Sequence, residues 1–183
     1  MLDGQNNMNF IDIYVKNYFA LARSSGLTEY MYILSNIFDV TIFSATIFLC
    51  FVFLVYLFRG IKYSMLFASS ILSTAILDYV LKVFFNVARP EGGVMSAFGQ
   101  SFPSFHAAVS AVFFIILIYI FDDYFSSFLR WSFNFACIFM IFAVSFSRVY
   151  LGVHWVSDVV AGVAFGGLMA YIFVYFFRKY KLL

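Results

Sequence analysis

Both histidines of this 183-residue chain lie next to long apolar segments, and one of them is followed by a carboxylate at helical spacing. In residues 147–158, His154 precedes Asp158 by four positions. On a helix this spacing places the carboxylate one turn from the imidazole, where it would orient the ring and stabilise its positive charge. The pair is a candidate for a catalytic histidine with its orienting acid. A structural hydrogen bond explains the pair alone equally well.

Three cations lie at the ends of the same apolar segments and predict a binding pocket for an anion. They are Lys82, Arg89 and Arg148. Arginine suits phosphate because its planar guanidinium donates two hydrogen bonds at once. Lys82 also follows Asp78 by four residues, so the two side chains share a helix face. For this lysine alone, the alternative is that its long side chain snorkels to the membrane surface as an anchor, with Asp78 as its ion-pair partner.

His106 follows Pro103 and Ser104 at the expected start of a helix. A helix N-terminus offers unpaired backbone N–H groups and a partial positive charge to an anion. A single histidine at such a position is more often a capping or interfacial residue. Only its combination with the other charged residues favours a chemical role.

The composition predicts a membrane protein with an all-α fold. The chain is 64% hydrophobic and only 11% charged, and apolar runs long enough to cross a bilayer recur along it. We predict one domain over residues 1–183, a polytopic helix bundle with about five transmembrane helices. The expected spans are 32–58, 63–85, 105–121, 128–147 and 155–177. The net charge of +2 does not support a nucleic-acid partner.

Small residues recur in the last predicted span, where Gly162 and Gly166 are four positions apart. Small residues at this spacing let helices approach closely in a membrane. We expect this stripe to pack the helix of Asp158 against the rest of the bundle.

Residues 1–26 are expected to form an N-terminal segment outside the bundle. Within it, residues 8–23 are apolar around most of a helix, and the polar residues fall on or near one stripe. The segment is too short and too polar to span a bilayer, so it predicts an amphipathic helix in the membrane interface. A helix packed over the end of the bundle is the alternative. Residues 1–7 lack the basic stretch of a cleaved signal peptide, so we expect the spans themselves to direct insertion.

The charges at the ends of the spans predict the orientation. Apart from Lys16 and Arg23, the side with the histidines holds only the three cations named above. The opposite side holds Arg59, Lys62, Arg130, Arg178, Lys179 and Lys181. By the positive-inside rule this second side and the C-terminus are cytoplasmic, and the histidines lie at the extracytoplasmic face.

Together, these stretches resemble the signature of the type-2 phosphatidic acid phosphatase superfamily, which includes lipid phosphatases, undecaprenyl diphosphate phosphatases, vanadium haloperoxidases and some lipid phosphotransferases. The first part of the signature is lysine, six residues and Arg-Pro, here residues 82–90. The second is Pro-Ser-any-His, here 103–106. The third is Ser-Arg, five residues, His, three residues and Asp, here 147–158. Every spacing is kept. Phe105 departs from the glycine that is common in the family, which affects substrate choice more than reaction type.

The resemblance implies a role for each matching residue. His154 would attack phosphorus and form a phosphohistidine, Asp158 would orient it, and His106 would protonate the leaving oxygen and then activate water. The phosphoryl oxygens would be held by Lys82, Arg89, Ser104 and Arg148. The family needs no cofactor or metal, and the sequence contains no acidic cluster suited to a metal ion.

The resemblance therefore predicts an integral-membrane lipid phosphatase in a bacterial inner membrane. It would hydrolyse a phosphomonoester or diphosphate of a membrane lipid. Its expected partners are this lipid phosphate and the surrounding membrane lipids. A lipid phosphotransferase with the same phosphohistidine is the first alternative. A non-catalytic anion-conducting or scaffolding protein is the second, and it would not explain three intact motifs. The sequence leaves the lipid and the oligomeric state open.

Overall fold

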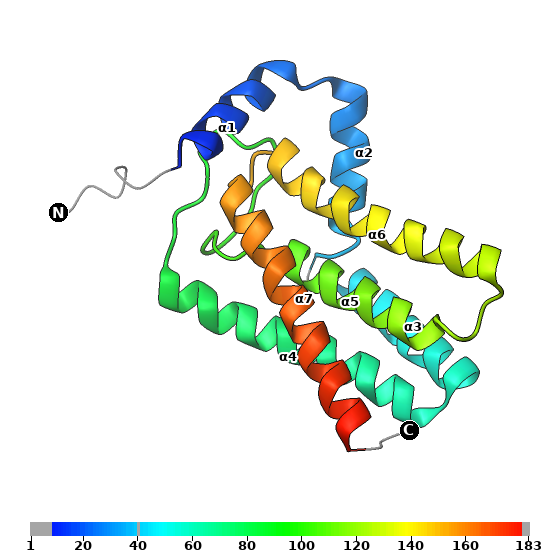
Figure 1. Cartoon of the computed structure of the whole chain (residues 1–183). Coiled ribbons are helices and arrows are strands. Elements are labelled where there is room, and N and C mark those ends of the chain that lie inside the picture. The colour runs from blue at the N-terminus through cyan, green and yellow to red at the C-terminus, as the bar shows by residue number, and fades with distance from the viewer. Residues whose placement is uncertain (1–8, 40, 181–183) are drawn as a thin grey trace.

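The computed structural model describes residues 9–39 and 41–180, and these residues form seven helices and no strand (Figure 1). The all-α prediction is therefore confirmed, whereas the expectation for residues 1–7 falls outside the described residues. The helices are α1 (Phe10–Ala22), α2 (Ser25–Asn36), α3 (Ile42–Arg59), α4 (Ile61–Phe85), α5 (Phe105–Phe121), α6 (Ser127–Tyr150) and α7 (Val156–Lys179).

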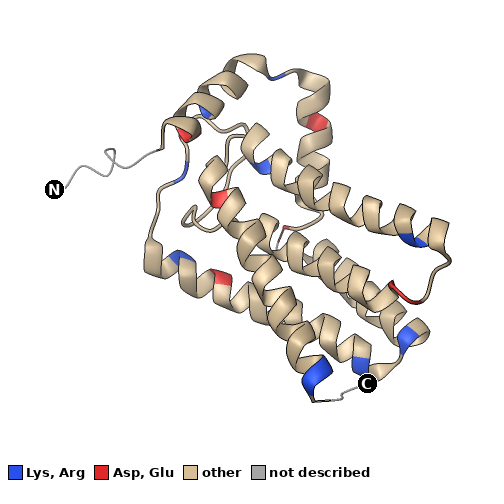
Figure 2. Ribbon diagram, viewed as in Figure 1, with Lys and Arg blue, Asp and Glu red and all other residues tan. Residues whose placement is uncertain are grey.

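Four of these helices, α3, α4, α6 and α7, are long and apolar enough to cross a membrane. Helix α5 is apolar but has only 17 residues, and it lies at the centre of the bundle against α4, α6 and α7. The prediction of a helix bundle with about five membrane helices is thus confirmed. The structure has four long apolar helices and the shorter helix α5 between them. Charged residues lie mostly toward the two ends of the bundle (Figure 2). This distribution fits a membrane protein, since charges are costly in the hydrocarbon layer.

The predicted first span, 32–58, is wrong at its start because the chain bends between α2 and α3. Helix α2 ends at Asn36 and α3 begins at Ile42. A reciprocal cap starts the new helix: the Ser44 N–H donates to Thr41 Oγ1 at 3.2 Å, and the Thr41 N–H donates to Ser44 Oγ at 3.0 Å. The apolar pattern continues across this bend, so hydropathy alone did not reveal it.

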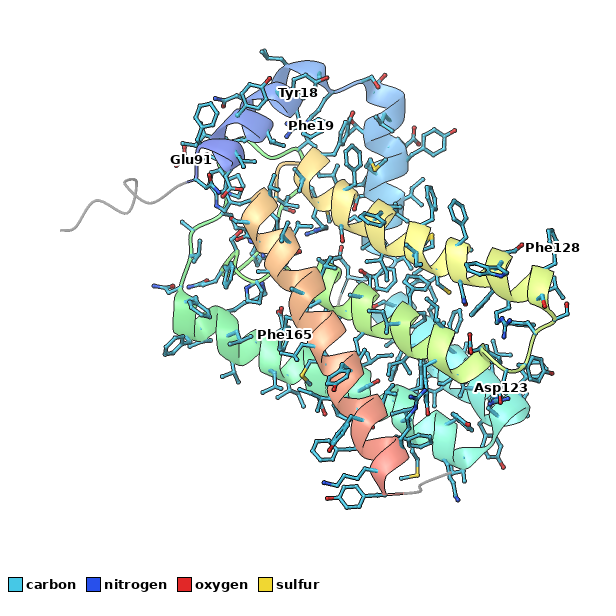
Figure 3. The ribbon with its side chains drawn as sticks, viewed as in Figure 1. Tyr18, Phe19, Glu91, Asp123, Phe128 and Phe165 are labelled. Atoms are coloured by element: carbon cyan, nitrogen blue, oxygen red, sulfur yellow. The ribbon has the colours of Figure 1, made fainter. Side chains whose placement is uncertain are left out.

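Helix α1 packs over the end of the bundle against α6 and α7, which favours the alternative considered for this segment. One polar residue of α1 faces the protein: the buried carboxylate of Asp12 accepts hydrogen bonds from the N–H and hydroxyl of Ser157, at 2.9 and 2.7 Å. Phe19 packs on α6, while Tyr18 is exposed (Figure 3). The outward apolar face, with Leu21 91% exposed, also suits a membrane interface, so that placement stays a prediction.

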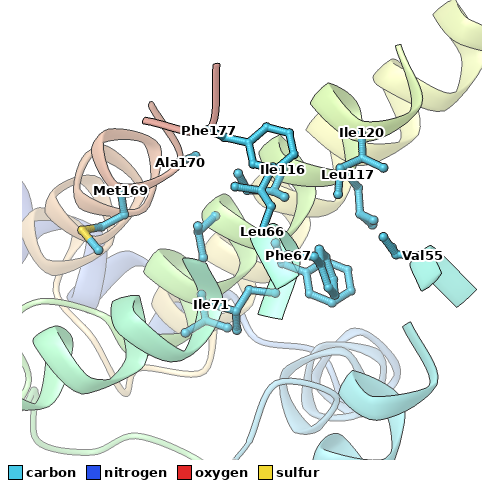
Figure 4. Packing of buried hydrophobic residues seen from close by; sticks show 13 residues of the cluster. Val55, Leu66, Phe67, Ile71, Ile116, Leu117, Ile120, Met169, Ala170 and Phe177 are labelled. Carbon is cyan, nitrogen blue, oxygen red and sulfur yellow. The ribbon is translucent and has the colours of Figure 1, made fainter. Parts of the chain in front are cut away.

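A buried apolar cluster joins α5 to its neighbours α3, α4 and α7 (Figure 4). It contains aromatic and branched side chains from all four of these helices. They include Val55, Leu66, Phe67, Val112, Phe113, Ile116, Ile120 and Phe177. This cluster fixes α5 along its length and thereby positions the N-terminal end of α5.

The backbones of α5 and α7 touch at the predicted small-residue stripe. A Cβ atom added at Gly162 would lie 2.6 Å from the carbonyl oxygen of Ser104, and one added at Gly166 would lie 2.8 Å from the Cβ of Ala111. Next to this contact, the Ser104 N–H donates to the carbonyl oxygen of Asp158 at 3.0 Å. The expected role of the stripe is confirmed, and it joins the start of α5 directly to the start of α7.

We predict that Gly162→Ala lowers the free energy of unfolding by about 1–3 kcal/mol, because the added methyl group would push α5 away from α7. Unfolding in detergent micelles, followed by circular dichroism, measures this change. Gly167→Ala is the matched control, because a Cβ atom added at Gly167 would lie 3.8 Å from its nearest neighbour, the Cδ1 atom of Ile115. Equal stability of the two variants would contradict the close contact.

Candidate active site

The three sequence stretches meet at one end of the bundle. Lys82 lies in the last turn of α4 and Arg148 in the last turn of α6, while His106 and Asp158 lie in the first turns of α5 and α7. His154 lies in the turn between α6 and α7. The structure thus brings the candidate residues to one place, and their individual catalytic roles stay predictions.

His154 and Asp158 form the expected pair, and both are buried. His154 Nδ1 lies 3.2 Å from Asp158 Oδ2. The same carboxylate oxygen accepts a hydrogen bond from the N–H of Trp155 at 2.9 Å, which caps the start of α7, and one from the Ser101 hydroxyl. Asp158 therefore holds both the helix start and the imidazole in one arrangement.

Arg89 lies against the other nitrogen of this imidazole. Its Nη1 is 3.0 Å from His154 Nε2 and 2.8 Å from the carbonyl oxygen of Val153. Because a guanidinium only donates hydrogen bonds, Nε2 accepts here and the proton of the neutral ring is on Nδ1, toward Asp158. The lone pair of Nε2 thus faces a cation, where a phosphoryl group would be attracted. Further hydrogen bonds from Arg89 go to the carbonyl groups of Phe98, Gly99 and Gln100.

Lys82 holds the connection that leads into α5. Its Nζ donates to the carbonyl oxygens of Gln100 and Ser101 at 3.4 and 3.3 Å, and also to that of Pro103. The expected pairing with Asp78 is present as an ion pair at 3.7 Å, longer than a hydrogen bond. Lys82 therefore has a structural role in this arrangement, in addition to any contact with a ligand.

Three buried polar groups at this end have no hydrogen-bond partner in the described part of the chain: the Asp78 carboxylate, whose only charged partner is Lys82 at 3.7 Å, and two groups that can donate, Ser104 Oγ and Arg148 Nε. Arg148 is 2% exposed, and its Nη1 donates to the hydroxyl of Ser35 at the end of α2. Unpaired buried donors are uncommon in proteins because they cost free energy. A ligand with several oxygen atoms would satisfy both donors.

His106 contacts a carboxylate that the sequence did not assign to the site. Its Nε2 lies 2.8 Å from Oδ1 of Asp39, in the bend between α2 and α3. Two further residues were missed, Ser101 beside Asp158 and Ser35 beside Arg148. The available signal for Asp39 was an acid inside an apolar run, which is unusual in a membrane segment and often functional.

The electrostatic surroundings keep His154 neutral. Burial holds the pKa of His154 well below its ordinary value of 6.5, and the positive charges of Arg89 and Arg148 lower this pKa further. The neutral ring is the nucleophilic form of histidine. The pKa of Asp39 is lowered, mainly by its hydrogen bond with His106, so this carboxylate is ionised. In the described residues no three His, Cys, Asp or Glu side chains are placed to hold a metal ion, and metal-free chemistry stays a prediction.

Comparison with known proteins places this geometry in a family. The model of the PAP2 superfamily matches residues 63–181. A segment of 81 residues, 44% of the chain, is 37% identical to the lipid A 4'-phosphatase of Bacteroides thetaiotaomicron, and it spans only 33% of that relative's length.

Two solved structures share the fold. A PAP2-type phosphatidylglycerolphosphate phosphatase from Bacillus subtilis aligns with a TM-score of 0.84 and 24% identity, covering 92% of this chain and 85% of the other. LpxE from Aquifex aeolicus aligns with a TM-score of 0.74 and 19% identity, covering 91% of this chain and 99% of the other. With the family match over residues 63–181, the chain belongs to the PAP2 superfamily.

Proposed function

We propose that this protein is an integral-membrane lipid phosphatase that works through a phosphohistidine at His154. The observation that carries the proposal is the placement of the His154 ring, with Nδ1 3.2 Å from Asp158 and Nε2 3.0 Å from Arg89. A neutral imidazole oriented by an acid is a nucleophile, and the arginine provides the charge that attracts a phosphoryl group. The likeness to a protein named as a lipid A 4'-phosphatase supports this reaction class.

In the first step, His154 Nε2 attacks phosphorus, and the N–P bond forms as the bond from phosphorus to the leaving oxygen breaks. His106 gives its proton to that oxygen. Arg89, together with the unpaired Ser104 hydroxyl and Arg148 Nε, would hold the phosphoryl oxygens and stabilise the transition state. In the second step, His106 takes a proton from water, the oxygen of this water attacks phosphorus, and the N–P bond breaks to release phosphate.

A lipid substrate is supported by an apolar cavity next to His106. The cavity has a volume of about 460 Å³ and extends from Asp39 and Phe105 to Phe48 and Phe113, between α3, α4 and α5. Ligand pockets in proteins have volumes of roughly 300–1,000 Å³ and are mostly apolar. A hydrocarbon chain in this cavity would leave its phosphate at the histidines.

We also propose that the site faces away from the cytoplasm, in a bacterial inner membrane. The end of the bundle opposite the histidines carries the basic residues Arg59, Lys62, Arg130, Arg178 and Lys179 (Figure 2). Basic residues outside a site favour the cytoplasmic side of a membrane.

A lipid phosphotransferase is the second candidate, since Phe105 lines the apolar cavity beside His106. An acceptor alcohol with an apolar body would fit at this position in place of water. The two activities differ only in the group that attacks the phosphohistidine.

We predict that purified protein releases phosphate from at least one member of a lipid panel in the presence of a metal chelator. The panel contains phosphatidic acid, phosphatidylglycerol phosphate, undecaprenyl diphosphate and lipid A 1-phosphate. His154→Ala should lower this release by at least about 10³-fold while the thermal unfolding midpoint is retained. Asp122→Asn, at the opposite end of the bundle, is the control. Full activity of His154→Ala would rule out the mechanism, and a phosphorylated product with added alcohols would identify a transferase.

We predict that Phe105→Ala changes the preference for chain length. Removing the ring enlarges the cavity. The ratio of kcat/KM for long-chain over short-chain lipid phosphates should therefore change by about tenfold or more, since each methylene group contributes to such selectivity. Phe98→Ala is the matched control, because Phe98 is 93% exposed and does not line the cavity. An unchanged ratio in Phe105→Ala would show that the chain binds elsewhere.

We predict that the His154 imidazole stays neutral well below pH 6.5, because its folded-state pKa is lowered. As the pH falls below this value, the unfolded chain binds a proton that the folded site does not, so His154 also makes folding less favourable in acid. A His106→Gln variant with an affinity tag free of histidine has one histidine left, and ¹⁵N NMR can follow its titration. A midpoint at or above pH 6.5 would contradict the inferred environment.

A further inference from the structure

We propose that Asp39 is a positioning residue that makes His106 the proton donor to the leaving oxygen. In this proposal the carboxylate holds the Nε2–H of His106, stabilises the protonated ring, and leaves Nδ1 to transfer the proton. The inference rests on the proposed function, because it assigns a part of the same reaction.

The contact itself is close and well enclosed. Asp39 Oδ1 and His106 Nε2 are 2.8 Å apart, and the two side chains are 28% and 8% exposed. In the described residues, Asp39 is the one carboxylate within ion-pair distance of His106. A charged hydrogen bond of this length fixes the ring and favours its cation.

The site thus contains two histidine–carboxylate pairs with different surroundings. Nε2 of His154 faces the guanidinium of Arg89, which disfavours a positive charge on that ring. His106 has the ionised carboxylate of Asp39 on Nε2, which favours a positive charge. Burial disfavours a positive charge on both rings. The hydrogen bond with Asp39 opposes this effect at His106, which suits a proton donor, while the contact with Arg89 reinforces it at His154, which suits a nucleophile.

The bend between α2 and α3 is built to hold Asp39 in place. The Asp39 carbonyl oxygen accepts hydrogen bonds from the Thr41 N–H at 2.9 Å and from the Ser44 hydroxyl, and the Asp39 N–H donates to Asn36 at 3.3 Å. Ser35, one turn earlier, holds Arg148. The end of α2 and the bend after it therefore supply a partner to each of two motif residues, Arg148 and His106.

The proton transfer is needed only when the leaving group is poor. The alkoxide of a lipid alcohol must be protonated as it leaves, whereas p-nitrophenolate leaves without help. In a single turnover, Asp39→Asn should slow the cleavage of a lipid phosphate by about 10²-fold or more, the scale of general acid catalysis. The first-turnover burst from p-nitrophenyl phosphate should stay within about threefold of the native rate. Single turnovers are required, since His106 also acts in the second step.

Two variants separate positioning from a purely structural effect. Asp39→Glu keeps the carboxylate and should recover part of the lipid rate. Asp12→Asn alters another buried acid, which binds Ser157 but not His106, so it should change the rates with both substrates by the same factor. Equal losses on both substrates in Asp39→Asn, or no loss on either, would overturn the role of Asp39.

A measurement without turnover separates this inference from the proposed function. With ¹⁵N-labelled histidine at about pH 8, above the ordinary histidine pKa of about 6.5, the neutral His106 ring should carry its proton on Nε2. The His154→Gln variant assigns the signal, and Asp39→Ala, which removes the acceptor, should lose this tautomer preference. A neutral ring protonated on Nδ1 would overturn the pairing even if no lipid is cleaved. If the native protein released phosphate from none of the substrates, the proposed function would be refuted instead.

Discussion

The backbones of α5 and α7 touch where Gly162 and Gly166 lack side chains, and the geometry of the candidate site depends on this contact. It allows the hydrogen bond from the Ser104 N–H to the Asp158 carbonyl oxygen, which joins the second motif to the third. A single methyl group at Gly162 would meet the carbonyl oxygen of Ser104. Since catalytic groups work only when held within a fraction of an ångström, helix packing and chemistry are constrained here by the same atoms.

The hydrogen bonds that hold Lys82 and Arg89 go mainly to backbone carbonyl groups, and Lys82 has in addition the longer ion pair with Asp78. Arg89 donates to four backbone carbonyl groups and Lys82 to three, those of Gln100, Ser101 and Pro103. A carbonyl group satisfies a buried donor without neutralising it, whereas a carboxylate would do both. The connection between α4 and α5 thus folds around two positive charges. Of these, Arg89 has no carboxylate within ion-pair distance in the described residues and stays available to an anion. This explains why a long polar connection is retained at the end of an otherwise apolar bundle.

The sequence was informative where the relevant residues lie close together along the chain. The spacing of His154 and Asp158 is a helix turn, and the pair is present; the limits predicted for the span at 105–121 match α5. The break between α2 and α3 was missed because apolar residues flank it on both sides. Asp39 was missed for a related reason: its partner His106 is 67 residues away, and no periodicity reports a contact between separate helices.

The N-terminal helix completes the site from outside the bundle. Asp12 accepts two hydrogen bonds from Ser157 at the start of α7, and Arg23 donates to the carbonyl oxygen of Tyr150 at the end of α6. These two contacts fasten both sides of the turn that carries His154. The same helix exposes Phe10 and Leu21, whose apolar surface suits the region where lipid headgroups meet hydrocarbon. A helix anchored at that depth would keep His154 level with the phosphate of a lipid whose chain remains in the membrane.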